Sequence, residues 1–126
     1  MLVGPTKLGK TDWARSLPGT HMYMQTYFNI ELWNPDADYL ILDDINFVKF
    51  PECRKAIWGG QREFNITGKY RKHMNVGWGK PTIFLCNHAN DFRYMLTDRG
   101  LPILPESERQ WYIDNSVVVE VTEKLY

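Results

Sequence analysis

The sequence contains only two cysteines, Cys53 and Cys86, and they do not form a CxxC pair. It therefore predicts neither a disulfide framework nor a four-ligand zinc site, and reduced thiols fit a cytosolic or nuclear protein. The chain has no apolar run near the roughly 18 residues that span a membrane, and no charged-then-apolar leader. We expect a soluble protein that is not secreted and has no membrane partner.

An excess of charge of either sign is also lacking, because 15 Lys and Arg balance 15 Asp and Glu. A net charge of zero neither favours nor excludes a nucleic-acid partner, since a local basic patch can bind while acids elsewhere balance it. With 126 residues, 44% of them hydrophobic and 14% aromatic, the sequence predicts one folded domain over residues 1–126.

Apolar runs alternate with helical segments along the chain. The run YLILDD is apolar up to its final acids, which is typical of a strand buried on both faces of a parallel sheet. Strands are expected at 1–3, 20–24, 39–44, 82–87 and 116–121, and helices at 12–17, 51–58 and 105–115. Residues 63–66 and 68–80 predict a β-hairpin inserted before the fourth strand. The expected fold class is α/β, a parallel sheet flanked by helices.

The loop after the first strand satisfies G-x-x-x-x-G-K-[ST] at every fixed position. Glycines let the backbone curl so that consecutive N–H groups face a phosphate. Lys10 would reach the β- and γ-phosphates of ATP, and the Thr11 hydroxyl would ligate Mg²⁺. The alternative is a chance glycine turn, but a strand before and a helix after favour a phosphate loop. The predicted ATP-binding residues are Gly4, Pro5, Thr6, Lys7, Leu8, Gly9, Lys10 and Thr11, with Lys7 expected to face solvent.

Two later strands end in polar side chains. Asp43 and Asp44 follow the run YLIL, and Asn87 follows TIFLC. The carboxyl ends of parallel strands face the crevice where such sheets bind ligands. We expect Asp43 to hold Mg²⁺ with Thr11, Asp44 to orient or deprotonate the attacking water, and Asn87 to hydrogen-bond the γ-phosphate. The alternatives are a solvated loop or helix cap for the acids and an Asx turn for Asn87.

The stretch between Gly68 and Lys80 is basic, contains no acid, and carries Tyr70 and Trp78. Cations contact phosphates and aromatic faces stack on bases, so the pattern indicates binding of single-stranded DNA. The alternative is a solvated turn whose aromatic side chains pack on the domain. The predicted DNA contacts are Lys69, Arg71, Lys72 and His73, the last two nearest the expected tip.

With these features in order, the chain resembles the superfamily 3 helicase domain of replication initiator (Rep) proteins of small circular single-stranded DNA viruses, especially geminiviruses and genomoviruses. The segments GPTKLGKTDWARSL, YLILDDI and TIFLCN resemble the family's Walker A, Walker B and motif C. The stretch GGQREFNITGKYRKHMNVGWGKP resembles its DNA-binding hairpin, and ESERQWYIDNSVVVEV resembles its closing helix and strand. The likeness covers nearly the whole chain.

The resemblance implies a P-loop ATPase of AAA+-like fold that works in the host nucleus. Such proteins assemble into a ring, usually a hexamer, and move 3′ to 5′ along single-stranded DNA in rolling-circle replication. It assigns ATP and Mg²⁺ to Lys10, Thr11, Asp43 and Asp44, and γ-phosphate sensing to Asn87. It also implies an arginine finger from a neighbouring subunit, for which Arg109 is the first candidate and Arg99 and Arg93 are the alternatives.

The chain departs from that family in one respect. No His-hydrophobic-His motif of an endonuclease is present, so DNA nicking is expected only of a longer parent protein. Because a phosphate-loop strand is normally about five residues long, the short run before Gly4 predicts that the chain is the ATPase part of such a protein. We then expect it to be a monomer without an oligomerisation segment.

Two other functions remain open from the residues. A small-molecule kinase also uses a phosphate loop with nearby acids, although it needs an arginine-rich lid where this chain has a basic aromatic hairpin. A non-catalytic fragment that binds nucleotide or DNA is the other possibility.

Overall fold

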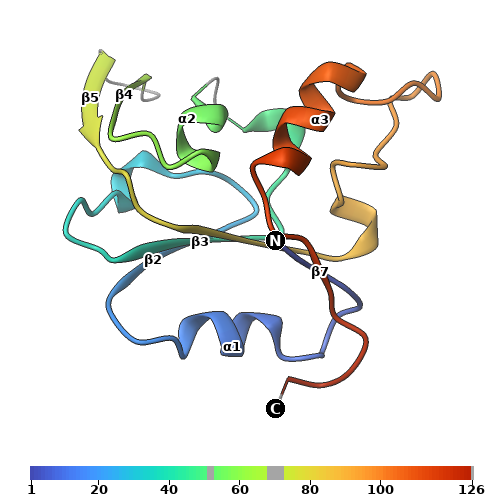
Figure 1. The fold of residues 1–126 in the computed structure, drawn as a ribbon, viewed down its shortest axis with the longest axis horizontal. Helices are drawn as coiled ribbons and strands as arrows, with labels where there is room; N and C mark the ends of the chain where they lie inside the picture. The colour runs from blue at the N-terminus through green and yellow to red at the C-terminus, as the bar shows by residue number, and fades with distance from the viewer. Residues whose placement is uncertain (51–52, 68–72, 126) are drawn as a thin grey trace.

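The computed structural model describes residues 1–50, 53–67 and 73–125, and for residues 66, 67 and 73–75 it describes the backbone alone. Five strands form one parallel sheet in the order β2-β3-β6-β1-β7 (Figure 1). They are β1 (Leu2–Val3), β2 (His21–Gln25), β3 (Tyr39–Asp43), β6 (Thr82–Cys86) and β7 (Val119–Glu120).

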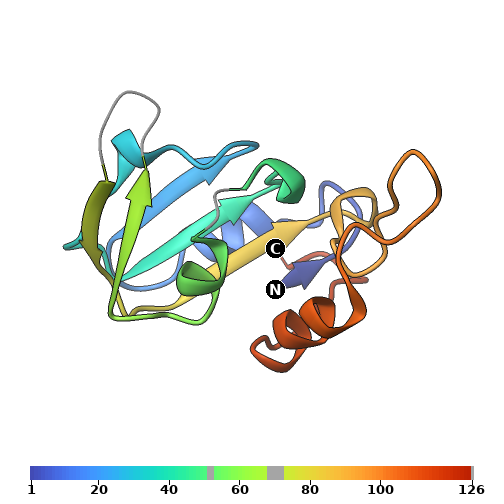
Figure 2. The same ribbon diagram turned by 90° about the horizontal axis from the view of Figure 1, so that it is seen from above.

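Helices cover both faces of this sheet. Helix α1 (Lys10–Arg15) lies on one face, and α2 (Arg54–Trp58) and α3 (Glu106–Asp114) lie on the other (Figure 1). The hairpin of β4 (Glu63–Thr67) and β5 (His73–Gly77) is antiparallel and lies on the same face as α2. Figure 2 shows it toward the β2 edge and α3 toward the β1 side. The expected α/β class, parallel sheet and inserted hairpin are therefore confirmed.

The bounds of some elements differ from expectation. Helix α1 begins at Lys10, two residues earlier than predicted, and ends at Arg15. Only Val119 and Glu120 of the expected strand 116–121 form β7, because their partner β1 itself has two residues. Three short 3₁₀ turns were not expected: η1 (Ile30–Leu32), η2 (Phe47–Lys49) and η3 (His88–Asn90). The first two residues of the helix predicted at 51–58 lie outside the described residues.

The surroundings of β3 on both faces of the sheet explain why its sequence is apolar at successive positions. Leu40 and Leu42 contribute to the core under the hairpin and α2, whereas Tyr39 and Ile41 contribute to the core under α1. All four side chains are buried, as a strand covered on both faces requires. A third cluster, around Tyr112 of α3, adds Phe47 and Phe92 with Trp58 against it. The described helices include none long and apolar enough to cross a membrane.

The chain changes direction across the sheet at β1. From β1 it crosses through α1 to the far edge at β2, returns through β3 and β6 to the side of β1, and reaches β7 on the other side. Ligands of such sheets bind outside the carboxyl ends of the strands at this kind of switch point. The loop that follows β1 therefore starts in the place where the topology favours a ligand.

Gly4 leaves β1 through a narrow space. Its N–H donates to the carbonyl oxygen of Cys86 at 3.1 Å. On the other side, a Cβ at this position would lie 2.4 Å from the carbonyl oxygen of Val121. Only glycine lets the backbone pass between β6 and the residue after β7, so Gly4 fixes where the following loop begins.

Substitution Gly4→Ala should therefore separate these backbones and lower the free energy of unfolding by about 1–3 kcal/mol, as overpacking does. Urea unfolding followed by tryptophan fluorescence measures the change. Gly77→Ala is the matched control, because a Cβ there meets nothing closer than 3.9 Å and should leave stability nearly unchanged. Equal stability of the two variants would contradict the close approach at Gly4.

Candidate functional site

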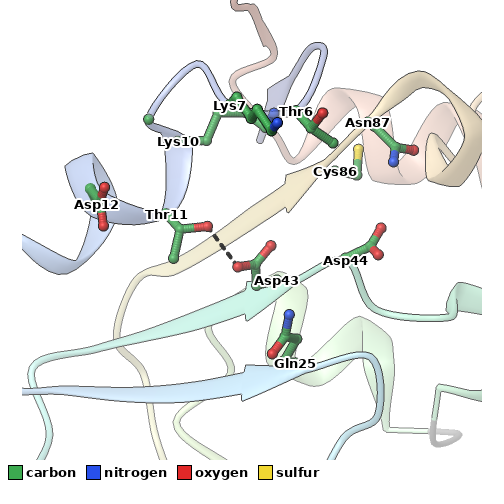
Figure 3. Close-up of a pocket in the computed structure, with 11 residues that line it drawn as sticks. Thr6, Lys7, Lys10, Thr11, Asp12, Gln25, Asp43, Asp44, Cys86 and Asn87 are labelled. Carbon is green, nitrogen blue, oxygen red and sulfur yellow. Dashed lines mark hydrogen bonds between the residues drawn. The ribbon is translucent and has the colours of Figure 1, made fainter. Parts of the chain in front are cut away.

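A pocket of about 330 Å³ opens at the carboxyl ends of β1, β3 and β6. Figure 3 shows that the predicted loop, the acid pair and Asn87 face it together, although they come from distant parts of the sequence. Its lining residues are Thr6, Lys7, Gly9, Lys10, Thr11, Asp12, Gln25, Asp43, Asp44, Cys86 and Asn87. Of the residues predicted to bind ATP, Gly4, Pro5 and Leu8 belong to the same loop without lining the pocket.

The loop between β1 and α1 has the curled backbone that the sequence predicts. Lys7 has a φ of 64° and Gly9 a φ of 84°, both in the left-handed region. Left-handed residues in a turn direct successive N–H groups toward one point, which makes a concavity for an anion. The side chain of Lys7 is exposed, as expected. The arrangement is suited to a phosphate group.

Lys10 reaches back across this loop. Its Nζ donates hydrogen bonds to the carbonyl oxygens of Gly4 at 2.9 Å and Pro5 at 2.7 Å. An ammonium group has three N–H donors, so two of them hold the curl of the loop. The positive charge is thereby kept at the concave side of the loop, where it would meet a phosphate.

Thr11 and Asp43 meet at the floor of the pocket. The Thr11 hydroxyl donates to Asp43 Oδ2 at 2.7 Å, the contact drawn as a dashed line in Figure 3. This separation is close to the roughly 2.9 Å between neighbouring oxygens around an octahedral Mg²⁺ ion with ligands at about 2.0–2.1 Å. Both residues come from positions that the sequence predicted as metal ligands. Their oxygen atoms therefore fit a magnesium ion.

The described residues include no group of three or more His, Cys, Asp and Glu side chains that could hold a metal ion. Mg²⁺ commonly binds through one or two protein oxygens and completes its shell with water and substrate phosphates. The pair Thr11 and Asp43 matches that mode of binding.

Asp44 is held on its own, one residue beyond β3. Its backbone is in the left-handed region, with a φ of 53°, and its N–H donates to the carbonyl oxygen of Leu85 at 2.8 Å. The side-chain amide of Asn90 donates to Asp44 Oδ1. The turn therefore points two neighbouring acids of the sequence in different directions, and both line the pocket.

Asn87 lies at the rim of the pocket in Figure 3. Its Oδ1 accepts a hydrogen bond from the backbone N–H of Asn90 at 3.2 Å and caps η3. A carboxamide whose oxygen is occupied in this way leaves its NH₂ group as the donor for another partner. This bond to the residue three positions on is a helix cap and not the Asx turn of the alternative, and it orients the amide.

Five residues of the site had not been predicted from the sequence, and two of them, Asp12 and Cys86, line the pocket. The Tyr23 hydroxyl donates to Asp43 Oδ2 at 2.5 Å, Gln25 also lines the pocket, and Asn90 contacts Asp44. Gln25 is paired in register with Asp43, so a polar residue directly after the strand predicted at 20–24 was a usable signal. Burial, together with the hydrogen bond and the charge of Asp43, raises the pKa of Tyr23 to about 12.

The candidate arginine fingers lie outside the pocket lining. Arg109 is half-buried in α3, and its Nη1 donates to the carbonyl oxygen of Arg93 at 3.3 Å. Arg93 forms an ion pair with the buried Asp91 at 2.7 Å and another with Glu120 at 3.3 Å. Arg99 is exposed in a turn. A role of any of them in a neighbouring subunit stays a prediction.

The basic hairpin is described only in part. Lys69, Arg71 and Lys72 lie outside the described residues, and only the backbone of His73, the first residue of β5, is described. Their contacts with DNA stay predictions.

Two other residues of the hairpin are better explained by packing. Trp78, expected to offer a face for stacking, is buried, with its ring centroid 5.1 Å from that of Trp33. Lys80 donates to the carbonyl oxygens of Pro35 at 2.8 Å and Ala37 at 2.6 Å. Trp78 thus packs on the domain, as the alternative for the aromatic side chains expected, and Lys80, which was not among the predicted DNA contacts, is held by backbone carbonyl groups.

The chain has one thiol that lines the pocket, Cys86, and one that does not, Cys53. Burial raises the pKa of Cys86 to about 12, with a further contribution from the charge of Asp91, and burial raises the pKa of Cys53 to about 11. Folding thus keeps both thiols protonated. Their contribution to stability is complete below the pKa of an unfolded thiol, about 8.5, and is lost as the pH rises through the folded values.

At pH 8.5 both thiols of the folded protein should react with iodoacetamide at least tenfold more slowly than in urea, since only the thiolate is nucleophilic. Mass spectrometry of peptides containing Cys53 or Cys86 measures each rate separately. Equal rates in the folded and unfolded protein would show that burial does not protect the thiols.

Comparison with known proteins gives the chain its relatives. It is 39% identical over 118 residues to the replication-associated protein of Chloris striate mosaic virus. The aligned region covers 93% of this chain and 30% of that protein. It is 45% identical over 97 residues to the replication-associated protein of a South African isolate of Maize streak virus genotype A, covering 76% of this chain and 27% of that protein. No model of a known protein family matches the chain. It spans less than a third of the length of these relatives, and it is a homologue of a segment of the replication-associated proteins of geminiviruses.

Proposed function

We propose that the chain is the ATP-hydrolysing domain of a viral replication initiator, a superfamily 3 helicase that uses Mg²⁺ and moves on single-stranded DNA in rolling-circle replication. The observation that carries the proposal is the contact of Thr11 with Asp43 at 2.7 Å beneath a curled loop that holds Lys10. A loop for phosphate and a pair of oxygens for magnesium thus adjoin in one pocket. Homology to viral replication-associated proteins supports the same conclusion.

Each side chain of the pocket has a task in this proposal. The ammonium of Lys10 and the N–H groups of the loop offset negative charge on the β- and γ-phosphates. Thr11 and Asp43 hold Mg²⁺, which would supply positive charge to the phosphates. Asp44 accepts a proton from the attacking water or orients that water, and the Asn87 amide donates to a γ-phosphate oxygen.

The proposal extends to partners that act on the same domain. Lys69, Arg71, Lys72 and His73 contact single-stranded DNA, through phosphates and without base specificity. Self-association of the complete protein into a ring brings an arginine, Arg109 before Arg99 or Arg93, to the γ-phosphate of a neighbouring subunit. In this proposal, the other groups that act on ATP come from the pocket of a single chain.

Lys10→Ala should abolish measurable ATP binding, because it removes both the charge and the support of the loop. Asp43→Asn should keep binding in the absence of Mg²⁺ but reduce hydrolysis by about 10²–10³-fold, the usual effect of losing one group that stabilises the transition state. Binding of a fluorescent ATP analogue and release of inorganic phosphate measure the two effects. Lys55→Ala is the control, because Lys55 forms an exposed ion pair with Glu108 on the opposite side of the sheet from α1. Unchanged nucleotide affinity of the Lys10 variant would refute the phosphate loop.

Single-stranded DNA should increase the rate of phosphate release, and the increase should fall with salt because the contacts are to phosphates. Steady-state hydrolysis with and without a homopolymeric oligonucleotide measures it. Phosphoryl transfer to an added nucleoside or sugar, in place of water, would instead identify a small-molecule kinase.

A further inference from the structure

The hydroxyl of Tyr23 reaches the site from a strand that carries none of the predicted motifs. It donates to Asp43 Oδ2 at 2.5 Å, and the hydroxyl of Thr11 donates to the same oxygen at 2.7 Å. One carboxylate oxygen thus accepts from two hydroxyl groups on different elements, β2 and α1. A carboxylate oxygen has two lone pairs in its plane, so the two donors can each use one of them.

The position of Tyr23 is fixed by the sheet and by α1. Strand β2 pairs with β3 in parallel, with Gln25 opposite Asp43, so Tyr23 lies two residues back on the same face of the sheet as Gln25. On the side of α1, the guanidinium of Arg15 lies 4.4 Å from the centroid of the Tyr23 ring. The Tyr23 ring, carried by β2, is therefore also held by a contact with α1.

The direction of this hydrogen bond does not change near neutral pH. A phenol has an ordinary pKa of about 10, so near neutral pH it keeps its proton and acts as the donor. Asp43 is then the acceptor from both hydroxyl groups.

We infer that Tyr23 is a positioning residue for magnesium: its hydroxyl occupies one lone pair of Asp43 Oδ2, and the other lone pair, which accepts from Thr11 in this structure, is the one that an ion held together with Thr11 would take. The inference rests on the proposed binding of ATP with Mg²⁺ and names a residue that this binding requires. Hydrogen-bond partners behind a metal ligand fix its orientation, and their loss commonly lowers metal affinity by about 10–100-fold. Tyr23 holds that place behind Asp43.

The hydrogen bond from Tyr23 also has an opposite effect on the affinity for magnesium. A donor to a carboxylate draws electron density from the oxygen and weakens it as a ligand, so its removal could also strengthen magnesium binding. Orientation prevails here, because Asp43 stands at the end of β3 and the Tyr23 and Thr11 hydroxyls are the only groups in the described part of the chain that hydrogen-bond its side chain. Without Tyr23 the carboxylate would be free to rotate away from Thr11.

Tyr23→Phe removes the hydroxyl and retains the ring. Its matched control is Tyr39→Phe, on the adjacent strand of the same sheet, since the Tyr39 hydroxyl donates to the carbonyl oxygens of Ala14 and Leu17, both at 3.1 Å, and not to a carboxylate. Binding of a fluorescent ATP analogue is titrated with Mg²⁺, and binding in EDTA is measured separately. Tyr23→Phe should raise the Mg²⁺ concentration at the midpoint about tenfold and leave affinity in EDTA unchanged, whereas Tyr39→Phe should leave the midpoint unchanged.

The outcomes separate this inference from the proposed function. Wild-type protein that binds the analogue without any dependence on Mg²⁺, or not at all, would refute the proposed function and the inference together. A Mg²⁺-dependent wild type with an unchanged or lowered midpoint in Tyr23→Phe would overturn the inference alone. If Tyr23→Phe does not fold, as judged by thermal unfolding, Arg15→Ala replaces it. That variant loosens the ring and should raise the midpoint severalfold, and an unchanged midpoint would count equally against the inference.

Discussion

The pairing of β1 with strands on both of its sides is the constraint on which the site depends. Leu2 and Val3 pair with Leu85 and Cys86 of β6 on one side and with β7 on the other. This two-residue strand joins β7 to the rest of the sheet and sets the starting point of the loop that follows. Because Gly4 continues directly from β1 with backbone on either side, the loop has little freedom in where it begins. Lys10 and Thr11 consequently face the ends of β3 and β6.

The acid pair shows how the same sheet assigns different surroundings to adjacent residues. Asp43 is the last residue of β3, and its side chain accepts from two hydroxyl groups. Asp44 already belongs to a left-handed turn, and its side chain accepts from an amide. The strand end therefore separates a carboxylate beside the loop from one beside Asn90. This division supports two distinct tasks for the pair, one with a metal ion and one with water.

Residues that follow short-range rules could be predicted from the sequence. The loop spacing, the apolar run of β3 and the polar ends of two strands depend on local conformation and on the general property that parallel strands end on one edge. Tyr23 could not be found in this way, because its contact with Asp43 depends on the register of β2 against β3 and on the reach of one ring. The packing of Trp78 stayed an alternative for a related reason: only the tertiary fold shows that Trp33 and Phe64 are there to cover it. Asn90 required knowledge of the turn that brings η3 to Asp44.

The hydrogen bonds of Lys10 to its own loop have a thermodynamic consequence. Two carbonyl oxygens of the loop accept hydrogen bonds from the same ammonium group that is proposed to meet a phosphate. The ammonium group therefore ties two points of the loop together by hydrogen bonds, which hold its curl. An arriving phosphate would find the backbone already ordered, so little of the free energy of association would be consumed by loss of chain entropy. On the proposed function, phosphate binding would then be limited more by desolvation of the ammonium and of the phosphate than by ordering of the loop.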